Sequence, residues 1–271
     1  MEVVFYNGEF VIKSDVSVSI SDRAFNYGDG FFETVKIINS TAVNFPTHFE
    51  RIQLALSILK LHNNYTLVFF QEKLSHLIKV NKIVDGSVKI HISRGGSGRY
   101  LPKSTHTNLF ITTNTGSAYK KNTPISLCFY DKECKAIGSL SNIKSINSLV
   151  SVLASVHAHE NNFDNAILFN SKGKIIEVAN ANIFIVRNHK IYTPSLCEGC
   201  VDGTMREWAT NHLNIIKKSI SKDEVLKAEE VFIANAISGF TSVKAIEGRS
   251  YTSSSIANYI QQKLINLSLD L

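Results

Sequence analysis

The 271-residue sequence has no long apolar run and no recognisable secretion signal. A membrane-spanning helix needs roughly 18 or more consecutive apolar residues, and no stretch approaches that length. The first residues, MEVVFYNGEFVI, also lack the basic stretch followed by an apolar one that directs secretion. These absences exclude a helical membrane protein and predict a cytoplasmic one.

A block of basic residues is also absent. The chain has 29 Lys and Arg against 23 Asp and Glu, a net charge of +6, but the cations are scattered among acidic and apolar residues. Nucleic-acid-binding surfaces cluster Lys and Arg on one face or along one helix, so no nucleic-acid partner is predicted. A mild positive charge also suits an enzyme for anionic small molecules. A non-enzymatic anion- or nucleic-acid-binding protein stays a remote alternative.

Cysteines are few, at positions 128, 134, 197 and 200. The last two form a C-x-x-C, CEGC, but a structural zinc site would need a second close pair or histidines at ligand spacing. No metal is therefore predicted. Reduced cysteines without a chemical role are favoured over a redox pair.

Turn signals and apolar spacing predict the elements of the first half. Asn7-Gly8 joins two apolar runs and is the preferred pair for a two-residue hairpin turn. Helical spacing of apolar residues predicts helices over 48–62 and 69–83. Strands at 87–96 and 106–114 flank the glycine-rich turn RGGSGRYLP.

The composition changes at residues 113–124, TNTGSAYKKNTP, which has little to bury and predicts an interdomain linker. The elements expected beyond it are a strand at 125–130, a helix after Lys144, hairpins over 165–178 and 182–194, a helix over 203–216, a strand at 230–235 and a helix over 254–267. The expected organisation is α+β, with a small N-terminal domain at 1–112 and a larger domain at 125–271.

Lys144, in SNIKSINSLVSVLASV, precedes an apolar helix, where an ammonium is costly to bury without a partner. It is either a surface cation or an amine held for chemistry. A lysine activated by burial or by a cationic neighbour can bond covalently to a carbonyl, including that of pyridoxal phosphate. That cofactor also needs a carboxylate for its pyridine nitrogen and cations and backbone N–H groups for its phosphate.

The sequence offers candidates for these further roles, each with a plainer alternative. Glu177, the only acid between Asp164 and Glu198, ends a strand, but it could be a solvated edge residue. Arg51 lies at the apolar boundary of a helix, where arginine often reaches solvent.

Two turns could supply backbone N–H groups to an anion. Gly203-Thr204-Met205 opens a helix, whose first N–H groups have no partner within the helix. NAISG, residues 235–239, could form a second such turn, or it could be an ordinary loop. Arg94 and Arg99 flank glycines that permit close approach of a ligand, although a hairpin turn explains those glycines equally well.

Taken in order, seven segments resemble the fold-type IV pyridoxal-phosphate enzymes, also called the class IV aminotransferases. The segments are SDRAFNYGDGFFETVKI, HFERIQLALSIL, ISRGGSGRYLP, IKSINSLVSVLA, GKIIEVANANIFIV, GCVDGTMRE and EVFIANAISGFTSV. They cover nearly the whole chain. The resemblance implies a D-amino-acid aminotransferase-like fold, with a small α/β N-terminal domain, a larger pseudo-barrel C-terminal domain that carries Lys144, and usually a homodimer.

The resemblance also implies roles for particular residues. Lys144 would bind pyridoxal 5'-phosphate covalently and then act as acid and base. Glu177, five residues before Asn182, would pair with the pyridine nitrogen, and Arg51 would bind the phosphate. The other residues implied are the phosphate-binding amides of Thr204, Met205, Ala236 and Ile237, and the substrate contacts Phe32, Arg94 and Arg99. The substrate would be a small amino compound bearing a carboxylate.

Four segments bear on which reaction the chain catalyses. A D-amino-acid aminotransferase would have a tyrosine where Phe32 stands and an Arg-x-His in the arginine-glycine loop, and this sequence has neither. GCVDGTMRE and NAISG resemble 4-amino-4-deoxychorismate lyase more closely. Branched-chain enzymes usually have Gly-Thr-Ala at 235–237 and are longer. The resemblance favours the lyase, with a branched-chain or other amino-acid aminotransferase of the same fold as the alternative.

Overall fold

The computed structural model describes residues 1–269, which form two compact units. The first unit comprises Met1–Ala118 with Ile143–Asn147, and the second comprises Tyr119–Asn142 with residues 148–269. The last two residues of the expected 125–271 domain lie outside the described residues. Each unit combines a sheet with helices, which confirms the α+β class. The sequence did not indicate that Ile143–Asn147, and with it Lys144, would pack with the first unit.

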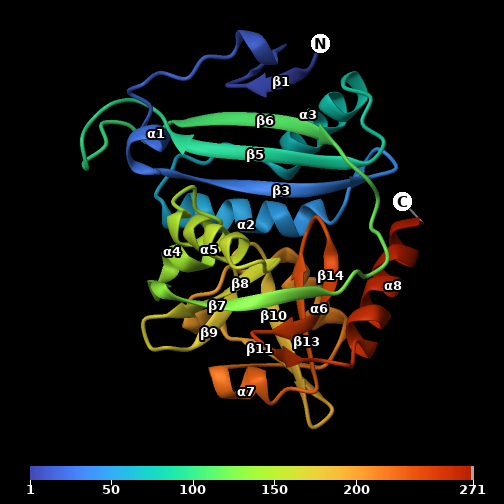
Figure 1. Ribbon diagram of the computed structural model, residues 1–271. Helices are drawn as coiled ribbons and strands as arrows, with labels where there is room; N and C mark the ends of the chain where they lie inside the picture. The colour runs from blue at the N-terminus through green and yellow to red at the C-terminus, as the bar shows by residue number, and fades with distance from the viewer. Residues whose placement is uncertain (270–271) are drawn as a thin grey trace. The chain divides into compact units, whose positions relative to one another are not determined.

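An antiparallel sheet forms the centre of the first unit (Figure 1). In order across the sheet, the strands within the described residues are β2 (Glu9–Ile12), β1 (Val3–Tyr6), β6 (Thr107–Thr115), β5 (Gly86–Arg94), β3 (Gly30–Ile38) and β4 (Thr41–Ala42). The hairpin expected at Asn7-Gly8 is confirmed, because Tyr6 pairs with Glu9 and the two turn residues have φ of 46° and 107°. Strand β3 was not predicted from the sequence.

Helices α2 (Phe45–Ile58) and α3 (Leu67–Val80) contribute to the same hydrophobic core as this sheet. Side chains alternate along β3, so Phe31, Val35 and Ile37 enter the core, while Phe32 lies on the opposite face. Glu33 lies on the same core-facing side of β3, where its carboxylate contacts side chains of α2. The short helix α1 (Arg23–Tyr27) begins at Asp22, whose carboxylate accepts the backbone N–H groups of Ala24 and Phe25.

A curled, mostly antiparallel sheet forms the centre of the second unit. Across the described residues its order is β12 (Ile215–Lys218), β11 (Lys190–Pro194), β10 (Asn182–Arg187), β13 (Glu230–Asn235), β14 (Gly239–Ile246), β7 (Ile125–Lys135), β8 (Asn165–Asn170) and β9 (Ile175–Val178), with β15 (Arg249–Ser250) beside β14. Bridges between Ile175 and Ile220 and between Val178 and Ala181 bring the far strand β9 back toward the start of the sheet. The expected pseudo-barrel is confirmed.

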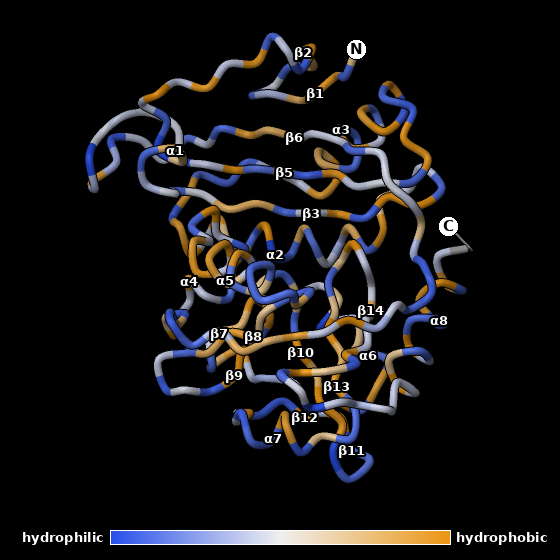
Figure 2. The backbone as a smooth tube through the Cα atoms, viewed as in Figure 1, coloured by the Kyte–Doolittle hydropathy of each residue, from blue (hydrophilic) through white to orange (hydrophobic). Residues whose placement is uncertain are grey.

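The helices of the second unit are α4 (Ser139–Asn142), α5 (Leu149–Glu160), α6 (Thr204–His212), α7 (Lys222–Leu226) and α8 (Ser255–Leu269). Figure 2 shows that β8, β10 and β13 are predominantly apolar, as strands covered on both faces should be. The helix expected over 203–216 is wrong at its end. It stops at His212, and Ile215 begins β12, which pairs in parallel with β11.

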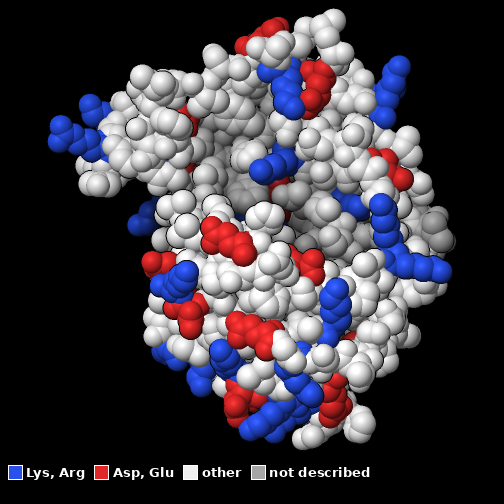
Figure 3. Space-filling model, viewed as in Figure 1, with Lys and Arg blue, Asp and Glu red and all other residues white. Residues whose placement is uncertain are grey.

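Within residues 1–269, no helix is both long enough and apolar enough to cross a membrane. On the face drawn in Figure 3, Lys and Arg are interspersed with Asp and Glu rather than gathered in one block. Cys128 and Cys200 are buried and Cys134 and Cys197 exposed, all as free thiols. Burial raises the pKa of Cys200 to about 12, so this thiol is protonated and unreactive at neutral pH.

Candidate active site

Lys144 lies on a short segment that extends the edge of the first unit's sheet beside β3. The backbone N–H of Phe32 donates to the carbonyl of Lys144 at 2.9 Å, and that of Ile146 donates to the carbonyl of Gly30 at 3.1 Å. Gly30 has no room for a side chain, since a Cβ there would lie 2.6 Å from the carbonyl oxygen of Ile92. These contacts explain why Ile143–Asn147 belongs to the first unit.

The side chain of Lys144 meets the aromatic ring of Phe32. Its Nζ lies 4.4 Å from the centroid of that ring, and Nζ of Lys89 lies 5.0 Å from the same centroid. His91, paired with Phe32 across β3 and β5, stacks on the ring at 5.9 Å. Burial and the neighbouring charge of Lys89 lower the pKa of His91 to about 4, so its imidazole is neutral at pH 7. Two amines therefore lie beside the same phenyl ring.

Arg51 projects from α2 onto the carboxylate of Glu33. Its Nε donates to Glu33 Oε1 at 2.6 Å and one terminal nitrogen donates to Oε2 at 2.7 Å, a bidentate contact. Nδ1 of His48, one turn earlier on α2, lies 2.7 Å from Oε2. Glu33 and His48 are each 1% exposed and Arg51 is 9% exposed, so this cluster is buried.

The electrostatics of this cluster are dominated by burial and by Arg51. Burial alone would raise the pKa of Glu33, but the charge and hydrogen bonds of Arg51 and the hydrogen bond to His48 outweigh it and lower the pKa to about 2. Burial lowers the pKa of His48, and the nearby cations Arg51 and Lys144 lower it further against the opposing effect of Glu33. Glu33 is thus ionised and fixes the orientation of the Arg51 guanidinium.

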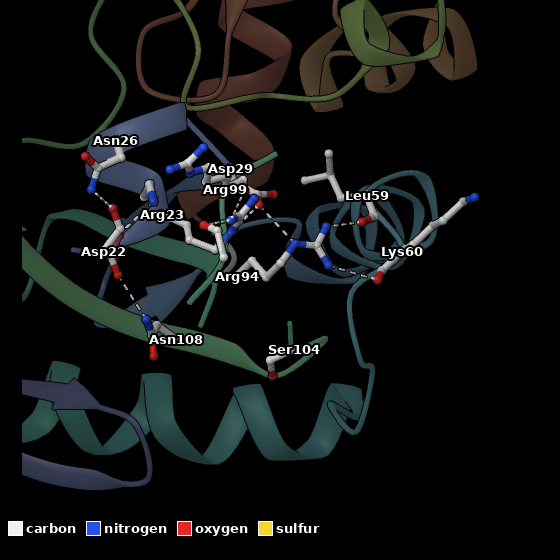
Figure 4. A network of polar contacts seen from close by, with 12 residues as sticks. Asp22, Arg23, Asn26, Asp29, Leu59, Lys60, Arg94, Arg99, Ser104 and Asn108 are labelled. Carbon is white, nitrogen blue, oxygen red and sulfur yellow. Dashed lines mark hydrogen bonds and ion pairs between the residues drawn. The ribbon is translucent and has the colours of Figure 1, made fainter. Parts of the chain in front are cut away.

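Arg94 lies in a separate polar network, drawn in Figure 4. Oδ2 of Asp29 accepts from Nε of Arg23 at 2.8 Å and from Nε of Arg94 at 3.0 Å. The two terminal nitrogens of Arg94 donate to the carbonyls of Leu59 and Lys60. All three nitrogens of Arg94 are therefore engaged by the protein, which favours a structural role over the substrate contact expected from the sequence.

The same network holds the glycine-rich loop at Arg99. NH1 of Arg23 donates to the carbonyl of Gly98 at 2.9 Å and to that of Arg99 at 2.6 Å. Arg99 itself is exposed. The backbone at Arg99 is therefore anchored, and a substrate contact through its side chain stays a prediction.

Glu177 lies on β9 in the second unit and is 5% exposed, unlike the solvated edge residue considered as the alternative. Its Oε1 forms an ion pair with Nζ of Lys135, at the end of β7. Its Oε2 accepts the backbone N–H of Val201 at 2.9 Å, just before α6. A carboxylate fixed on both oxygens is well placed to orient a further group, because each oxygen has a second lone pair.

The start of α6 has the form of an anion-binding site. Gly203 is the N-cap residue of this helix, so the N–H groups of Thr204 and Met205 lie at the positive end of the helix dipole. Thr204 and Met205 are each 3% exposed. A side chain at position 203 would collide with Oδ1 of Asn182, so glycine is required for this approach.

The turn after β13 contains Ala236 and Ile237. Asn182 on β10 pairs with Ala234 on β13, so this turn and the start of α6 lie near the same end of the two strands. The carbonyl of Ala236 accepts from the hydroxyl of Tyr119 at 2.9 Å. The N–H of Ile237 already donates to Oδ1 of Asn235 at 3.0 Å, so a phosphate contact there would require that side chain to turn away.

The groups present suit pyridoxal phosphate. Within the first unit, Lys144 is an amine and Arg51 an oriented cation; within the second, Glu177 is a buried carboxylate and residues 203–205 begin a helix. Within residues 1–269, no three His, Cys, Asp or Glu side chains group as metal ligands.

Comparison with known proteins decides the family. The model of the amino-transferase class IV family matches residues 30–246. The chain belongs to this family. Class IV aminotransferases of this fold use pyridoxal phosphate, so the protein is a pyridoxal-phosphate-dependent aminotransferase or lyase.

Individual proteins similar to this chain carry different names. The D-alanine aminotransferase of Bacillus licheniformis is 25% identical over 91% of this chain and 89% of its own length. The aminodeoxychorismate lyase of Vibrio harveyi is 27% identical over 84% of this chain and 87% of its own. The branched-chain aminotransferase of Thermoproteus uzoniensis shares the fold with a TM-score of 0.93, at 22% identity over 99% of this chain and 95% of that one.

Sequence reasoning missed Glu33, His48 and Lys135. Glu33 and His48 stand in GDGFFET and HFERIQ, two of the segments that carry the family resemblance, so their position in those motifs was an available signal. Lys135, in DKECK, had no such signal, because its contact with Glu177 depends on how the strands of the second unit pair.

Proposed function

We propose that this class IV enzyme is a 4-amino-4-deoxychorismate lyase, which eliminates pyruvate from its substrate and leaves 4-aminobenzoate for folate synthesis. The observation that supports this most directly is the phenyl ring of Phe32 beside the amine of Lys144, at 4.4 Å. A flat apolar ring suits a cyclic substrate that becomes aromatic, because offset or edge-to-face aromatic contacts are favourable. The ring itself carries no proton donor, in contrast to a tyrosine at this position.

The residues of the chain would divide the work as follows. Bound pyridoxal phosphate supplies an electron sink that lets a proton leave the carbon next to the substrate nitrogen. Lys144 would hold the cofactor and, once the substrate is bound, would take that proton. Glu177 keeps the pyridine nitrogen protonated. Arg51, oriented by Glu33, would bind the phosphate from the first unit; the amides of Thr204 and Met205 are the candidates in the second unit, with Ala236 and Ile237 weaker ones.

A second candidate is an amino-acid aminotransferase. Its support is the similarity to the D-alanine aminotransferase, which extends over 91% of the chain. A transaminase would use Lys144, Glu177 and Arg51 in the same roles but would return the proton to the cofactor and require a keto acid as acceptor. Phe32 in place of a tyrosine and the missing Arg-x-His weaken this candidate.

The product assay separates the two. The enzyme is given 4-amino-4-deoxychorismate without any keto acid, and pyruvate and 4-aminobenzoate are followed over many turnovers. In parallel, D-alanine, leucine and valine are offered with 2-oxoglutarate. Sustained pyruvate release supports the lyase. Glutamate formation without elimination would overturn it in favour of the aminotransferase.

We further propose a homodimer formed through α5. Leu149, Val152, Leu153 and Val156 lie at helical spacing along one side of α5 and are 68%, 52%, 46% and 47% exposed. Single exposed apolar residues are ordinary, but a continuous stripe of four is typical of a surface that another molecule covers. A second copy of the chain is the expected occupant, and the cytoplasmic location stays a prediction.

A further inference from the structure

Lys135 and Glu177 form an ion pair across strand β8 in the sheet of the second unit. Strand β8 lies between β7, which ends at Lys135, and β9, which carries Glu177. Neighbouring strands are about 4.8 Å apart, so the contact needs a side chain as long as lysine to reach across β8. The ammonium contacts Oε1 of Glu177, while the backbone N–H of Val201 holds Oε2.

Burial makes this pair energetically important. The side chain of Glu177 is 6% exposed and that of Lys135 is 18% exposed. Charges attract more strongly in such surroundings than in water, and a buried carboxylate deprived of its cation is strongly disfavoured. The electrostatic attraction between the ammonium of Lys135 and the carboxylate of Glu177 is therefore stronger than it would be for an exposed lysine.

Other charged groups near Glu177 are engaged elsewhere. The terminal nitrogens of Arg206, on α6, contact the carbonyl of Pro194 at 2.9 Å and Oδ1 of Asp202 at 3.5 Å. Glu198 accepts from Nδ2 of Asn170, the residue that pairs with Lys135 across the strands. The thiol of Cys200 is a further titratable neighbour, and burial keeps it protonated.

We propose that Lys135 is a positioning residue that fixes the carboxylate of Glu177 through their ion pair and, through it, keeps the proton on the pyridine nitrogen of the bound cofactor. The inference rests on the proposed pairing of Glu177 with that nitrogen. Transfer of the proton from nitrogen to carboxylate would erase the negative charge next to Lys135 and lose the attraction between them. A protonated nitrogen is the stronger electron sink, so Lys135 supports the reaction without touching the substrate.

The test is the protonation state of the cofactor, read by NMR of enzyme loaded with pyridoxal phosphate labelled with ¹⁵N in the ring. The chemical shift of that nitrogen is followed against pH in wild type, Lys135→Met, Lys135→Arg and Glu177→Gln. Lys132→Met is the matched control, because Lys132 lies on the same strand and is exposed. Unfolding of each apo-protein, with Lys135→Gln as a second neutral variant, checks that the fold is kept.

Lys135→Met should lower the ratio of protonated to unprotonated nitrogen at a given pH by roughly ten- to a hundredfold, the effect of one charge-assisted contact. Lys135→Arg should restore the wild-type shift, and Lys132→Met should not change it. If both neutral Lys135 variants keep the wild-type chemical shift while Glu177→Gln loses the proton, the role of Lys135 is overturned and that of Glu177 stands. A wild-type shift in Glu177→Gln would overturn the role of Glu177 and this inference with it.

Discussion

At the residue scale, Glu33 and Arg51 depend on one another. Arg51 lowers the pKa of Glu33 to about 2, and Glu33 fixes two nitrogens of the Arg51 guanidinium. Removal of Arg51 alone would leave a buried carboxylate without its cation, which typically costs about 3–5 kcal/mol. A simple Arg51→Ala variant would therefore confuse lost stability with lost cofactor binding.

The double variant Glu33→Gln/Arg51→Gln removes both charges and leaves no unpaired ion. We expect it to fold and to bind pyridoxal phosphate roughly ten- to a hundredfold more weakly, because a charge-assisted contact to phosphate contributes about 1.5–3 kcal/mol. Titration of the apo-enzyme measures this, with the exposed Arg249→Gln as control. Unchanged affinity in the double variant would remove Arg51 from the phosphate site.

Glu177→Gln should retain the cofactor but slow turnover. The amide keeps the shape of the side chain but loses the charge that stabilises a protonated pyridine nitrogen. Loss of one such electrostatic stabiliser typically costs about 10²-fold or more in kcat. Steady-state kinetics at saturating cofactor check this, with absorption spectra to establish occupancy. Turnover near the wild-type rate would show that Glu177 has another role.

At the element scale, the contact between β3 and α2 should make folding stability depend on pH. The folded-state pKa of Glu33, about 2, lies below its ordinary value of 4.5. The contribution of ionised Glu33 to the free energy of unfolding is therefore complete above pH 4.5 and is lost as the pH falls toward 2. This contribution amounts to roughly 3 kcal/mol. Glu33→Gln should flatten the pH dependence of the free energy of unfolding in that window.

His91 on β5 provides a contrast in a different pH window. Burial and Lys89 lower its folded-state pKa from 6.5 to about 4. Between these two pH values the unfolded chain binds a proton at His91 and the folded protein does not, so the free energy of unfolding decreases as the pH falls through this range. His91→Gln should flatten the curve there and leave the lower window unchanged. Urea titrations at a series of pH values measure both effects. An unaltered slope below pH 4.5 in Glu33→Gln would contradict the charge assignment of the buried cluster.

Local sequence predicted elements well where turns and helical spacing are strong, as at the Asn7-Gly8 hairpin and in α2 and α3. It failed at β3, whose residues FFETVKII carry a buried glutamate explained only by α2. It also failed after His212, where pairing of Ile215 with Ile191 on β11 overrides the helical pattern. Such contacts depend on register and on distant elements, which local patterns do not encode.

At the scale of the whole molecule, the order of motifs predicted more than any single residue. Lys144 and Glu177 each had an ordinary alternative, yet seven segments in the family's order indicated the fold that the structure has. The reaction is less accessible, because relatives at 25–27% identity include both a transaminase and a lyase. The assembly is likewise a prediction, and α5 provides its test.

Charged residues on the α5 stripe should separate the copies of the chain. We expect Leu153→Glu/Val156→Glu to sediment as a monomer while wild type sediments as a dimer, because the new carboxylates would have to be buried without partners. Ser155→Glu, exposed on the same helix but off the stripe, is the matched control. A variant that stays dimeric would exclude α5 from the interface, and a monomeric wild type would contradict the homodimer.

The central claim is that Lys144 carries the cofactor, and borohydride reduction of the holoenzyme tests it most directly. Reduction makes the link between cofactor and lysine permanent, so peptide mapping identifies the residue. We expect a phosphopyridoxyl group on Lys144. We expect none on Lys89, whose amine lies beside Phe32, or on Lys135, whose amine contacts Glu177. Label on a different lysine, or a protein that stays colourless after reconstitution with excess pyridoxal phosphate, would contradict it.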